Sequence, residues 1–524
     1  MTTLNETLLR QAASALATVL APHGPADAKL SAYFRENPKL GQKDRAFIAE
    51  TVYQVIRRKR LLEYLADGAD ARRLLLAALL RVQGVSLGHL GPHLSKIQTD
   101  WAHAIKAKST DNLPLAVQAD LPDWLWDKLV AQYGEQEALS LSRAMHLSAP
   151  LDLRVNRLNG QREAVLALFT KEGMTATPTP YSPDGVRLKE KIPLNKHVLF
   201  NKGVIEVQDE GSQLLTLLLA PRRGEMVADF CAGAGGKTLA LGALMANSGR
   251  LYAFDVAEKR LSNLRPRLAR SGLSNIHPQL IVNERDPKLK RLAQKFDRVL
   301  VDAPCSGLGT LRRNPDLKWR QTEMDVAELS IKQGNILDAA SKLVKTGGRL
   351  VYATCSVLRE ENENIVEAFL ARHPEFKQLN AADILAQQKV PVDTGLTLKM
   401  LPHLHGTDGF FAAAFERRAA GDTVPVGEAS VEEAPVVEVP VAPAAPKKAA
   451  RTTKAKTASA TKVVADKPAM KATSNPRTAA KSKAAVAVAA DTEEADAPKA
   501  GAKPKAVAKP KAAPRTKKTT PAKA

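Results

Sequence analysis

The stretch FDRVLVDAPCSGLG, residues 296–309, decides the fold together with LVYATCS at residues 350–356. Each stretch begins as a short apolar strand and delivers a cysteine at or just past its carboxyl end, Cys305 and Cys355. The third cysteine in the 524 residues, Cys231, follows another predicted strand in VADFCAGAGGKT. Open α/β sheets bind and react at the carboxyl ends of their strands. Because cysteines are rare in this chain, their positions at strand ends favour a role in a reaction over a role in packing.

Around these strands, residues 221–418 alternate between strand and helix patterns. The strand-like segments are MVADF, RLYAFDV, IHPQLIV, FDRVLVD and RLVYATCS, and helical patterns separate most of them. Such alternation predicts a doubly wound, mostly parallel, Rossmann-like sheet of class α/β. The segment GFFAAAFERR, residues 409–418, is expected to be the last strand, at the edge of the sheet.

The rest of the chain divides into three regions by sequence pattern. Residues 1–145 repeat apolar side chains at helical spacing, which predicts an all-α domain. Residues 146–220 mix strand, helix and turn patterns, which predicts a small α+β subdomain leading into the sheet. Residues 419–524 consist mainly of Ala, Lys, Pro, Thr and Val. Because such a tail cannot bury enough apolar surface to offset its ordering entropy, we expect it to be disordered.

The net charge of +22 is unevenly distributed along the chain. Residues 441–524 carry +15, residues 419–440 carry −5, and the first 418 residues carry +12. A basic folded part is expected of a protein that binds a polyanion such as RNA. The basic tail is either a non-specific electrostatic tether for nucleic acid or a solubilising appendage.

Cysteine usage and hydropathy restrict the class of protein. Three cysteines exclude a disulfide framework, and no pair has the spacing of a zinc site, so we expect no metal. The first twenty residues lack the basic-then-apolar order of a signal peptide. No apolar run approaches the ~20 residues that span a bilayer. We therefore expect a soluble, cytoplasmic monomer without a membrane partner.

Residues 231–238, CAGAGGKT, have the composition of a nucleotide-binding loop. A P-loop requires glycine five positions before the Gly-Lys pair, where Cys231 stands. A dinucleotide fingerprint requires a glycine where Thr238 stands. The remaining interpretation is the S-adenosyl-L-methionine loop of a methyltransferase, whose glycines admit the ligand and whose helix N-terminus faces its carboxylate. Asp255, 22 residues past Gly233, is placed to accept from ribose hydroxyls.

A methyl donor beside strand-end thiols indicates a carbon acceptor of low nucleophilicity, such as C5 of a pyrimidine. A thiolate that adds to C6 moves electron density to C5 and splits one difficult step into two easier ones. The carboxyl group of Asp302 can hold the ring at N3 and share a proton as that density develops. Within a duplex the ring is hidden, so the target must be unpaired or flipped.

These segments carry a family resemblance. CAGAGGKT, LYAFDV, DAPCSGLGT and YATCS, in that order and spacing, resemble the Sun/Nop/RsmB family of RNA cytosine-C5 methyltransferases. The resemblance covers residues 146–418 and extends to VQDEGSQ and DGFFAAAFER. The segment LSAYFRENPKLGQKDRAFIAETVYQVIRRK resembles the NusB-like RNA-binding domain of the bacterial ribosomal members.

The resemblance implies a role for each matched residue. Cys355 is the expected nucleophile, Cys305 the cysteine that assists release of the methylated RNA, and Asp302 the carboxylate at N3, close to the donor. The family usually has an acid near the adenine, whereas this chain reads IVNERDP, where Asn283 is the match by position and Asp286 the alternative. The implied donor-binding residues are Cys231, Ala232, Gly233, Ala234, Gly235, Gly236, Lys237, Asp255, Asn283 and Asp302.

The implied activity is methylation of a cytosine in RNA, with small-subunit (16S) ribosomal RNA expected because of the helical leader. Three alternatives remain open. The substrate is transfer RNA; or the protein is a DNA cytosine methyltransferase in which Cys305 attacks; or it is a non-catalytic, RNA-binding factor for ribosome assembly. Which cytosine is modified cannot be read from the side chains.

Two basic segments are expected to contact RNA. TLRRNPDLKWR, residues 310–320, follows the Pro-Cys strand, which favours phosphate contacts from its cations and base stacking on Trp319. The cluster at residues 57–60, RRKR, lies on a predicted helix and is either a phosphate-contacting or a solvated face.

Overall fold

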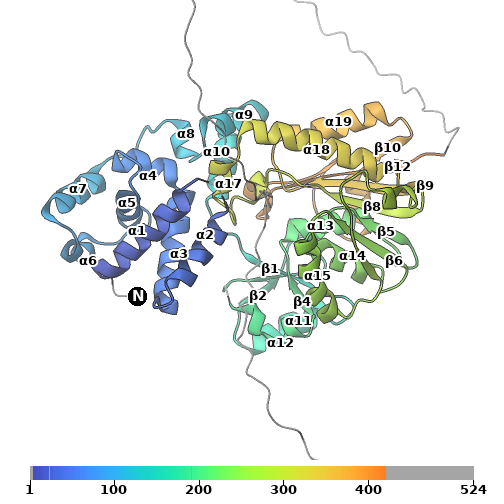
Figure 1. Cartoon of the computed structure of the whole chain (residues 1–524), viewed down its shortest axis with the longest axis horizontal. Coiled ribbons are helices and arrows are strands. Elements are labelled where there is room, and N and C mark those ends of the chain that lie inside the picture. The colour runs from blue at the N-terminus through green and yellow to red at the C-terminus, as the bar shows by residue number, and fades with distance from the viewer. Residues whose placement is uncertain (1–3, 23, 191, 420–524) are drawn as a thin grey trace, which may run out of the picture. The chain divides into compact units, whose positions relative to one another are not determined.

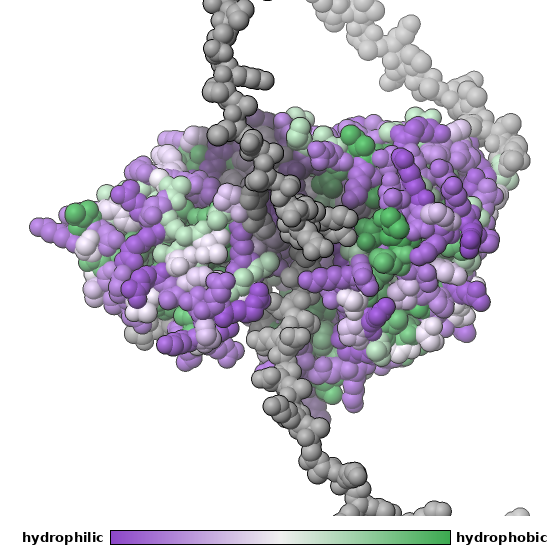
Figure 2. Space-filling model, viewed as in Figure 1, coloured by the Kyte–Doolittle hydropathy of each residue, from purple (hydrophilic) through white to green (hydrophobic). Residues whose placement is uncertain are grey.

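The structure is a computed structural model that describes residues 4–22, 24–190 and 192–419 (Figure 1). The tail predicted to be disordered and basic, residues 419–524, lies outside the described residues except for Ala419. Within the described ranges, none of the helices has both the length and the apolar character of a membrane span. The face of the molecule in Figure 2 is largely hydrophilic, with apolar groups scattered over it.

The first part of the chain is helical, as its periodicity predicts. In α1 (Glu6–Leu20) the buried residues recur every three or four positions, and in α5 (Ala71–Arg81) all seven residues of 74–80 are buried. These two helices share one apolar core with their neighbours. The neighbouring helices are α2 (Ala26–Glu36), α3 (Gln42–Arg57), α4 (Lys59–Ala66), α6 (Leu87–Leu90), the 3-10 turn η1 (Gly91–His93) and α7 (Lys96–Ala107).

Three further helices belong to a different core. They are α8 (Leu115–Gln118), α9 (Asp123–Tyr133) and α10 (Glu135–Met145). Their apolar residues cluster with Leu308, Val326 and Leu358, which belong to the region of the large sheet, and not with the core of α1 and α5. The region predicted as one all-α domain therefore contains two packing units.

A small antiparallel sheet follows, with strand order β2-β3-β1-β4. Its strands are β1 (Leu151–Val155), β2 (Ala176–Pro178), β3 (Gly185–Leu188) and β4 (Ile205–Val207). Helix α11 (Arg162–Lys171) covers this sheet through Val165 and Phe169. The turn η2 (Leu194–Lys196) and α12 (Val198–Asn201) connect β3 to β4.

The large sheet has eight strands among the described residues, in the order β10-β12-β9-β8-β5-β6-β7, with β11 beside β12. The strands from β9 to β7 are parallel. The strands are β5 (Met226–Asp229), β6 (Arg250–Asp255), β7 (Ile276–Leu280), β8 (Phe296–Asp302), β9 (Val344–Thr354), β10 (Phe376–Leu379), β11 (Leu398–Met400) and β12 (Phe410–Arg417).

Helices cover both faces of this sheet (Figure 1). Helices α13 (Glu210–Leu219), α14 (Gly236–Leu244) and α15 (Glu258–Ser271) lie on one face, and α18 (Glu323–Ser341) and α19 (Glu363–Arg372) lie on the other. The predicted doubly wound α/β fold is thereby confirmed. The shorter elements are α16 (Pro287–Lys290), η3 (Leu308–Thr310), α17 (Leu317–Arg320), η4 (Arg359–Glu361), α20 (Ala381–Gln387) and α21 (Pro402–His405).

The strand order differs from prediction at β12. The segment 409–418 was expected at the edge, but β12 lies between β9 and β10 and pairs antiparallel with both. All six residues of 410–415 are buried. A continuous apolar run is typical of a strand covered on both faces, so the sequence fits an interior position better than an edge.

The topology brings the carboxyl ends of three strands together. The chain runs from β5 through β6 to β7 on one side, and β8 and β9 lie on the other side of β5. Such a reversal leaves a crevice at the carboxyl ends of the strands beside it, where open α/β sheets bind ligands. Here those ends are Asp229, Asp302 and Thr354.

Candidate functional site

The two strand-end cysteines face each other. Because β8 and β9 are parallel neighbours, the loops that follow them leave the sheet side by side. The Sγ atoms of Cys305 and Cys355 are 3.2 Å apart, and both side chains are half-buried. The hydrogen bond with Cys355, together with burial, raises the pKa of the Cys305 thiol well above its ordinary value. Cys305 therefore carries its proton at neutral pH.

A lysine and an aspartate form an ion pair beside the cysteines. Lys237 Nζ donates to Asp302 Oδ2 at 2.7 Å, with little of the Lys237 side chain exposed. Burial acts to lower the pKa of Lys237, but the charge of Asp302 and its hydrogen bond outweigh it, so the pKa is raised. A negative charge on Cys355 also raises it, which places the ammonium within electrostatic reach of that sulfur. The pair thus supplies a fixed cation next to one thiol.

The glycine loop between β5 and α14 adopts a conformation that requires glycine. Gly233 and Gly235 have φ angles of +58° and +87°. A Cβ atom on Gly235 would lie 2.1 Å from the side chain of Leu264. Gly236 is the first residue of α14, so the loop ends at a helix N-terminus, where free backbone N–H groups favour an anionic group.

Asp255 holds this loop from the end of β6. One carboxylate oxygen accepts from the backbone N–H of Gly233 at 2.8 Å and the other from that of Ala257 at 2.7 Å. The side chain is only 3% exposed. Asp255 therefore orders the loop through hydrogen bonds that its predicted role as a ribose ligand did not anticipate.

The remaining loop residues are held by their backbone or by packing. Ala232 N–H donates to Phe254 O at 2.8 Å, and Ala234 O accepts from Arg267 at 2.9 Å. The thiol of Cys231 packs against the apolar cluster under β5 and β8. Burial raises the pKa of the Cys231 thiol well above the ordinary value, which favours its protonated form.

Asp229 is a residue of this site that sequence reasoning missed. It ends β5, is 1% exposed, and accepts from Thr238 Oγ1 at 2.7 Å through one oxygen. Its other oxygen has no hydrogen-bond partner among the described residues. Burial raises its pKa to about 7. The sequence feature that could have identified Asp229 is an acidic residue at the end of an apolar strand, directly before the glycine loop.

The structure places Asn283 and Asp286 in the loop after β7. Asn283 is exposed, and its side chain accepts from the backbone N–H of Arg285 at 2.8 Å. Asp286 is buried and caps α16, accepting from the backbone N–H groups of Val282 and Lys288. Both Asp286 oxygens are thus committed to the loop, while the side-chain N–H groups of Asn283 donate no hydrogen bond within the described part of the chain. Which of them faces an adenine stays a prediction.

Arg312 and Arg313, which were expected to contact RNA, have partners inside the protein. Arg312 is 6% exposed and donates to the carbonyls of Gly406 and Thr407 at 2.8 and 2.7 Å. Arg313 joins two buried carboxylates, which belong to Asp209 at 2.8 Å and Asp408 at 2.6 Å. Both guanidinium groups therefore fasten the loop to the protein.

Lys318 and Trp319 contact the helical region. Lys318 is 1% exposed and donates to Arg57 O at 2.9 Å, and Trp319 Nε1 donates to Ile56 O at 2.8 Å. Arg57 in turn donates to Arg312 O at 2.8 Å.

The other cations of the 57–60 cluster are also paired. Arg58 pairs with Asp120 at 2.9 Å and Arg60 with Asp123 at 2.6 Å, while Lys59 pairs with Glu63 on its own helix. Segments 57–60 and 310–320 thus form a contact inside the molecule.

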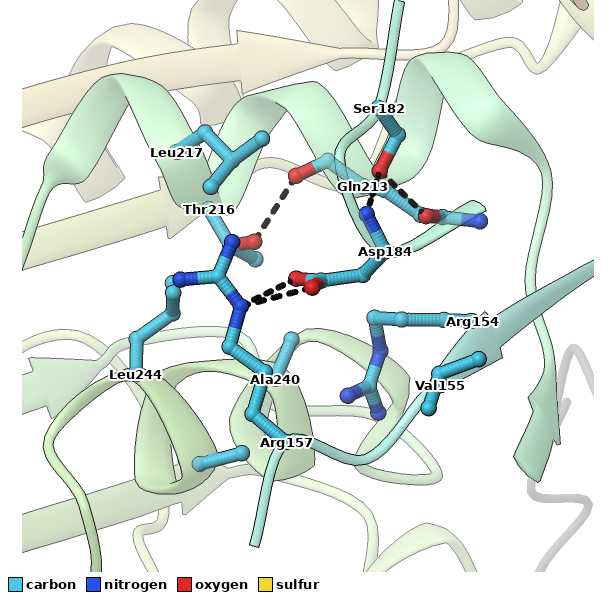
Figure 3. Close-up of a pocket in the computed structure, with 11 residues that line it drawn as sticks. Arg154, Val155, Arg157, Ser182, Asp184, Gln213, Thr216, Leu217, Ala240 and Leu244 are labelled. Atoms are coloured by element: carbon cyan, nitrogen blue, oxygen red, sulfur yellow. Dashed lines mark hydrogen bonds and ion pairs between the residues drawn. The ribbon is translucent and has the colours of Figure 1, made fainter. Parts of the chain in front are cut away.

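A small cavity lies away from the cysteines, between the small sheet and helices α13 and α14 (Figure 3). Arg157 and Asp184 pair across it, and Ser182 donates to Gln213 at 2.7 Å. Its volume of about 10 Å³ holds at most one water molecule. The cavity therefore joins two parts of the fold and is not the reaction site.

Beneath the two cysteine loops lies a polar pair that the sequence analysis did not single out. Glu361 is 0% exposed and Asn362 is 1% exposed. Their signal was the segment LREENENIV, in which acids and amides follow directly on the second cysteine strand.

Solved structures share this architecture. The crystal structure of PH0851 has a TM-score of 0.64 at 26% sequence identity, over 79% of this chain and 99% of that protein. A methyltransferase homolog protein from Pyrococcus horikoshii has a TM-score of 0.51 at 28% identity, over 59% of this chain and 100% of that protein. The fold is that of a methyltransferase, and the predicted cofactor, S-adenosyl-L-methionine, is confirmed.

Sequence comparison identifies the family. The model described as "16S rRNA methyltransferase RsmB/F" matches residues 216–416, and the model of its "ferredoxin-like domain" matches residues 121–195, which joins α9 and α10 to the small sheet. The probable ribosomal RNA small subunit methyltransferase B of Synechocystis sp. is 33% identical over 415 residues, 72% of this chain and 92% of that protein. The predicted resemblance is confirmed, and the chain belongs to the RsmB/F family of methyltransferases.

Proposed function

We propose that this protein transfers a methyl group from S-adenosyl-L-methionine to C5 of a cytosine in small-subunit ribosomal RNA, through a covalent bond between Cys355 and C6. The observation that carries the proposal is the pair of sulfurs 3.2 Å apart beside the Lys237–Asp302 ion pair. The family, and the name of its Synechocystis member as a probable ribosomal RNA small subunit methyltransferase B, support ribosomal RNA as the substrate. In this proposal the protein acts in the cytoplasm.

The residues around the glycine loop fit the donor. Two glycines of the loop are in the left-handed conformation and would let the donor approach the backbone, and the N-terminus of α14 would hold the carboxylate of its methionine part. Asp255 lies at the end of β6, where the ribose is expected. Two apolar side chains that follow β6 and β7 are exposed, Val256 at 55% and Val282 at 81%, and they would pack against the adenine. When bound, the donor supplies an electrophilic methyl group on its sulfonium.

Asp302 and Lys237 orient the target ring in this proposal. The Asp302 carboxylate is partly exposed at the carboxyl end of β8, where it can meet N3 of the pyrimidine. Lys237 fixes the position of that carboxylate and keeps a positive charge near Cys355. A nearby cation favours the thiolate form of a cysteine, and the thiolate is the nucleophile.

The chemistry then runs in two steps. Attack by the Cys355 thiolate forms the Sγ–C6 bond and moves the C5=C6 electron pair toward C5, which takes the methyl group. Loss of the C5 proton to a base restores the double bond and expels the Cys355 thiolate. Cys305 lies 3.2 Å from the sulfur that leaves, and it assists this second step. The hydrogen bond between Cys305 and Cys355 is the largest cause of the raised pKa of Cys305. When Cys355 bonds to C6, this hydrogen bond is removed.

The adduct test separates this assignment from attack by Cys305. Cys305→Ala and Cys355→Ala are incubated with donor and RNA, and each serves as the matched control of the other. We expect a denaturant-resistant protein–RNA adduct with Cys305→Ala and none with Cys355→Ala, whose methyl transfer should fall on the order of 10³-fold or more. The reverse pattern would overturn the roles assigned here.

The substrate is tested on RNA from cells with and without the gene. Bisulfite sequencing should show one cytosine in small-subunit ribosomal RNA that loses its protection when the gene is deleted. Loss of protection in transfer RNA instead would reassign the substrate.

A further inference from the structure

The residues on both sides of Cys305 are held by buried side chains. Ser306 donates its backbone N–H to Glu361 Oε1 at 2.7 Å and its hydroxyl to Glu361 Oε2 at 2.5 Å. The carbonyl of Pro304 accepts from Gln333 Nε2 at 3.0 Å, and the same Nε2 donates to Glu361 Oε1 at 3.0 Å. Both neighbours of Cys305 thus depend on a network centred on one carboxylate.

The residues on both sides of Cys355 are held in the same manner by Asn362. Thr354 Oγ1 donates to Asn362 Oδ1 at 2.5 Å, and Asn362 Nδ2 donates to the carbonyl of Ser356 at 3.1 Å. The amide therefore spans the cysteine from one neighbour to the other.

The two side chains that hold the cysteine loops belong to neighbouring residues, because Glu361 and Asn362 are consecutive in the chain. Tyr352 in β9 donates its hydroxyl to the carbonyl of Glu361 at 2.6 Å, which anchors the pair to the sheet. Glu361 and Asn362 are 0% and 1% exposed, so water does not compete for these hydrogen bonds. Both carboxylate oxygens of Glu361 and both polar atoms of the Asn362 amide are hydrogen-bonded. Buried hydrogen bonds of this kind fix one arrangement and make alternatives costly.

We propose that Glu361 and Asn362 are positioning residues that set the distance between the Cys305 and Cys355 sulfurs and thereby the rate at which methylated RNA is released. This inference rests on the proposed function. Release requires Cys305 to act on the adduct held by Cys355, and a shift of about 1 Å in such a geometry is enough to slow a reaction ~100-fold. The negative charge of Glu361 also contributes to the raised pKa of the Cys305 thiol.

The first test measures the sulfur–sulfur geometry without RNA. Diamide, an azo oxidant, converts two thiols into a disulfide and is itself reduced to the hydrazine. The rate of Cys305–Cys355 closure, followed by alkylation and peptide mapping, is compared for Glu361→Ala, Glu361→Gln and Asn362→Asp. The matched controls are Glu360→Ala, which loses only its pairing with Lys128, and the exposed neighbour change Asn364→Asp.

We expect closure to slow at least fivefold in Glu361→Ala and Asn362→Asp and to match the wild type within twofold in both controls. Glu361→Gln should be intermediate, because its amide oxygen still accepts from Ser306 N–H. Thermal melting and donor binding by calorimetry report whether each variant is folded, and Glu361→Gln is the variant to use if the alanine change does not fold. Closure at the control rate in folded variants would overturn the proposal.

The second test measures turnover on RNA. We expect kcat to fall at least tenfold in Glu361→Ala with the KM for the donor unchanged, and a larger share of RNA to remain as a denaturant-resistant adduct. Slower closure with normal turnover would also overturn the proposal, because the sulfur distance would then not govern release. If Cys305→Ala traps no adduct at all, the proposed function fails, while the diamide rates still report on the positioning of the sulfurs.

Discussion

The cysteine loops and the basic loop at residues 310–320 differ in what their functional groups contact. Around the cysteines, buried neighbours bind the flanking backbone and hydroxyl groups. The two half-buried sulfurs contact each other, and Cys305 Sγ also accepts from the backbone N–H of Cys355 at 3.4 Å. In the basic loop, the charged atoms themselves are bound, Arg312 and Arg313 by carbonyls and carboxylates and Lys318 by a carbonyl of α3. The cysteine loops therefore leave their sulfurs partly accessible, whereas the basic loop uses its charged groups to hold other segments of the protein.

The difference has an energetic cause. Burying an unpaired charge is costly, so a cation that leaves water must find acceptors within the protein. At the contact between the helical region and the sheet, Lys318 and Trp319 donate to carbonyls of α3, and Arg57 of α3 donates to the carbonyl of Arg312. The following predictions test whether the two kinds of loop respond differently to substitution, from the largest expected effect to the smallest.

The basic loop should control stability. Arg313→Ala leaves the buried carboxylates of Asp209 and Asp408 without their closest cation, since Arg312 lies 3.9 Å from Asp408. We expect a loss of about 3 to 4 kcal/mol of unfolding free energy, as for other broken buried pairs. Urea unfolding followed by Trp fluorescence measures it.

The matched control is Arg285→Ala, whose side chain is 81% exposed and which should change stability by less than about 0.5 kcal/mol. The folded fraction of Arg313→Ala should bind RNA with wild-type affinity. A clear loss of RNA affinity with unchanged stability would restore the RNA-contacting role that we assigned to this loop from the sequence.

The reactive site should respond in rate and not in stability. Lys237→Met removes the cation that holds Asp302 and lies near Cys355. Loss of one preorganised charge in an active site costs on the order of 10²-fold in kcat. Single-turnover methyl transfer to RNA measures it, with the exposed Lys342→Met as control. A variant that melts early but keeps its kcat would show that the ion pair is structural.

The sequence predicted which side chains meet at the carboxyl ends of the strands better than it predicted the residues that hold them. Strand-end cysteines, the glycine loop and Asp302 were predictable because a parallel sheet brings the carboxyl ends of neighbouring strands together. The role proposed for Glu361 was not predictable, because it depends on a turn that folds back under β8. Hydrophobic periodicity in the sequence does not indicate where a turn folds back in this way. Asp229 lies in the predicted strand MVADF but was not among the predicted site residues. An acidic residue at the end of an apolar strand is informative, because acidic residues are rarely buried.

In the basic loop, the sequence showed the charged residues but not their partners. Its cations were assigned to RNA because their charge and their position beside a cysteine strand fit a polyanion. Whether a cation is solvated depends on acceptors supplied by distant segments, such as Asp408 and the carbonyl of Arg57. Charge in a sequence therefore indicates that a partner is needed, and only the fold shows whether that partner lies inside the molecule.

Lys318 offers the finest test of this contact, through pH. Burial lowers the pKa of Lys318 to about 7, with Asp120 opposing and Arg57, Arg58 and Lys59 reinforcing the shift. In the unfolded chain its pKa is about 10.4. Between these values the unfolded state binds the extra proton, so this group's contribution to stability rises with pH by about 1.4 kcal/mol per unit.

We therefore expect the wild type to gain about 2 kcal/mol over Lys318→Met between pH 7.5 and pH 9. Urea unfolding at both values measures this, and Lys295→Met, an exposed lysine, should follow the wild type. Parallel pH profiles of the wild type and Lys318→Met would mean that Lys318 keeps its proton when folded. The ammonium would then be held as a charge by Asp120, and the contact between α3 and the basic loop would be an ion-pair interface instead of a neutral amine hydrogen-bonded to a carbonyl.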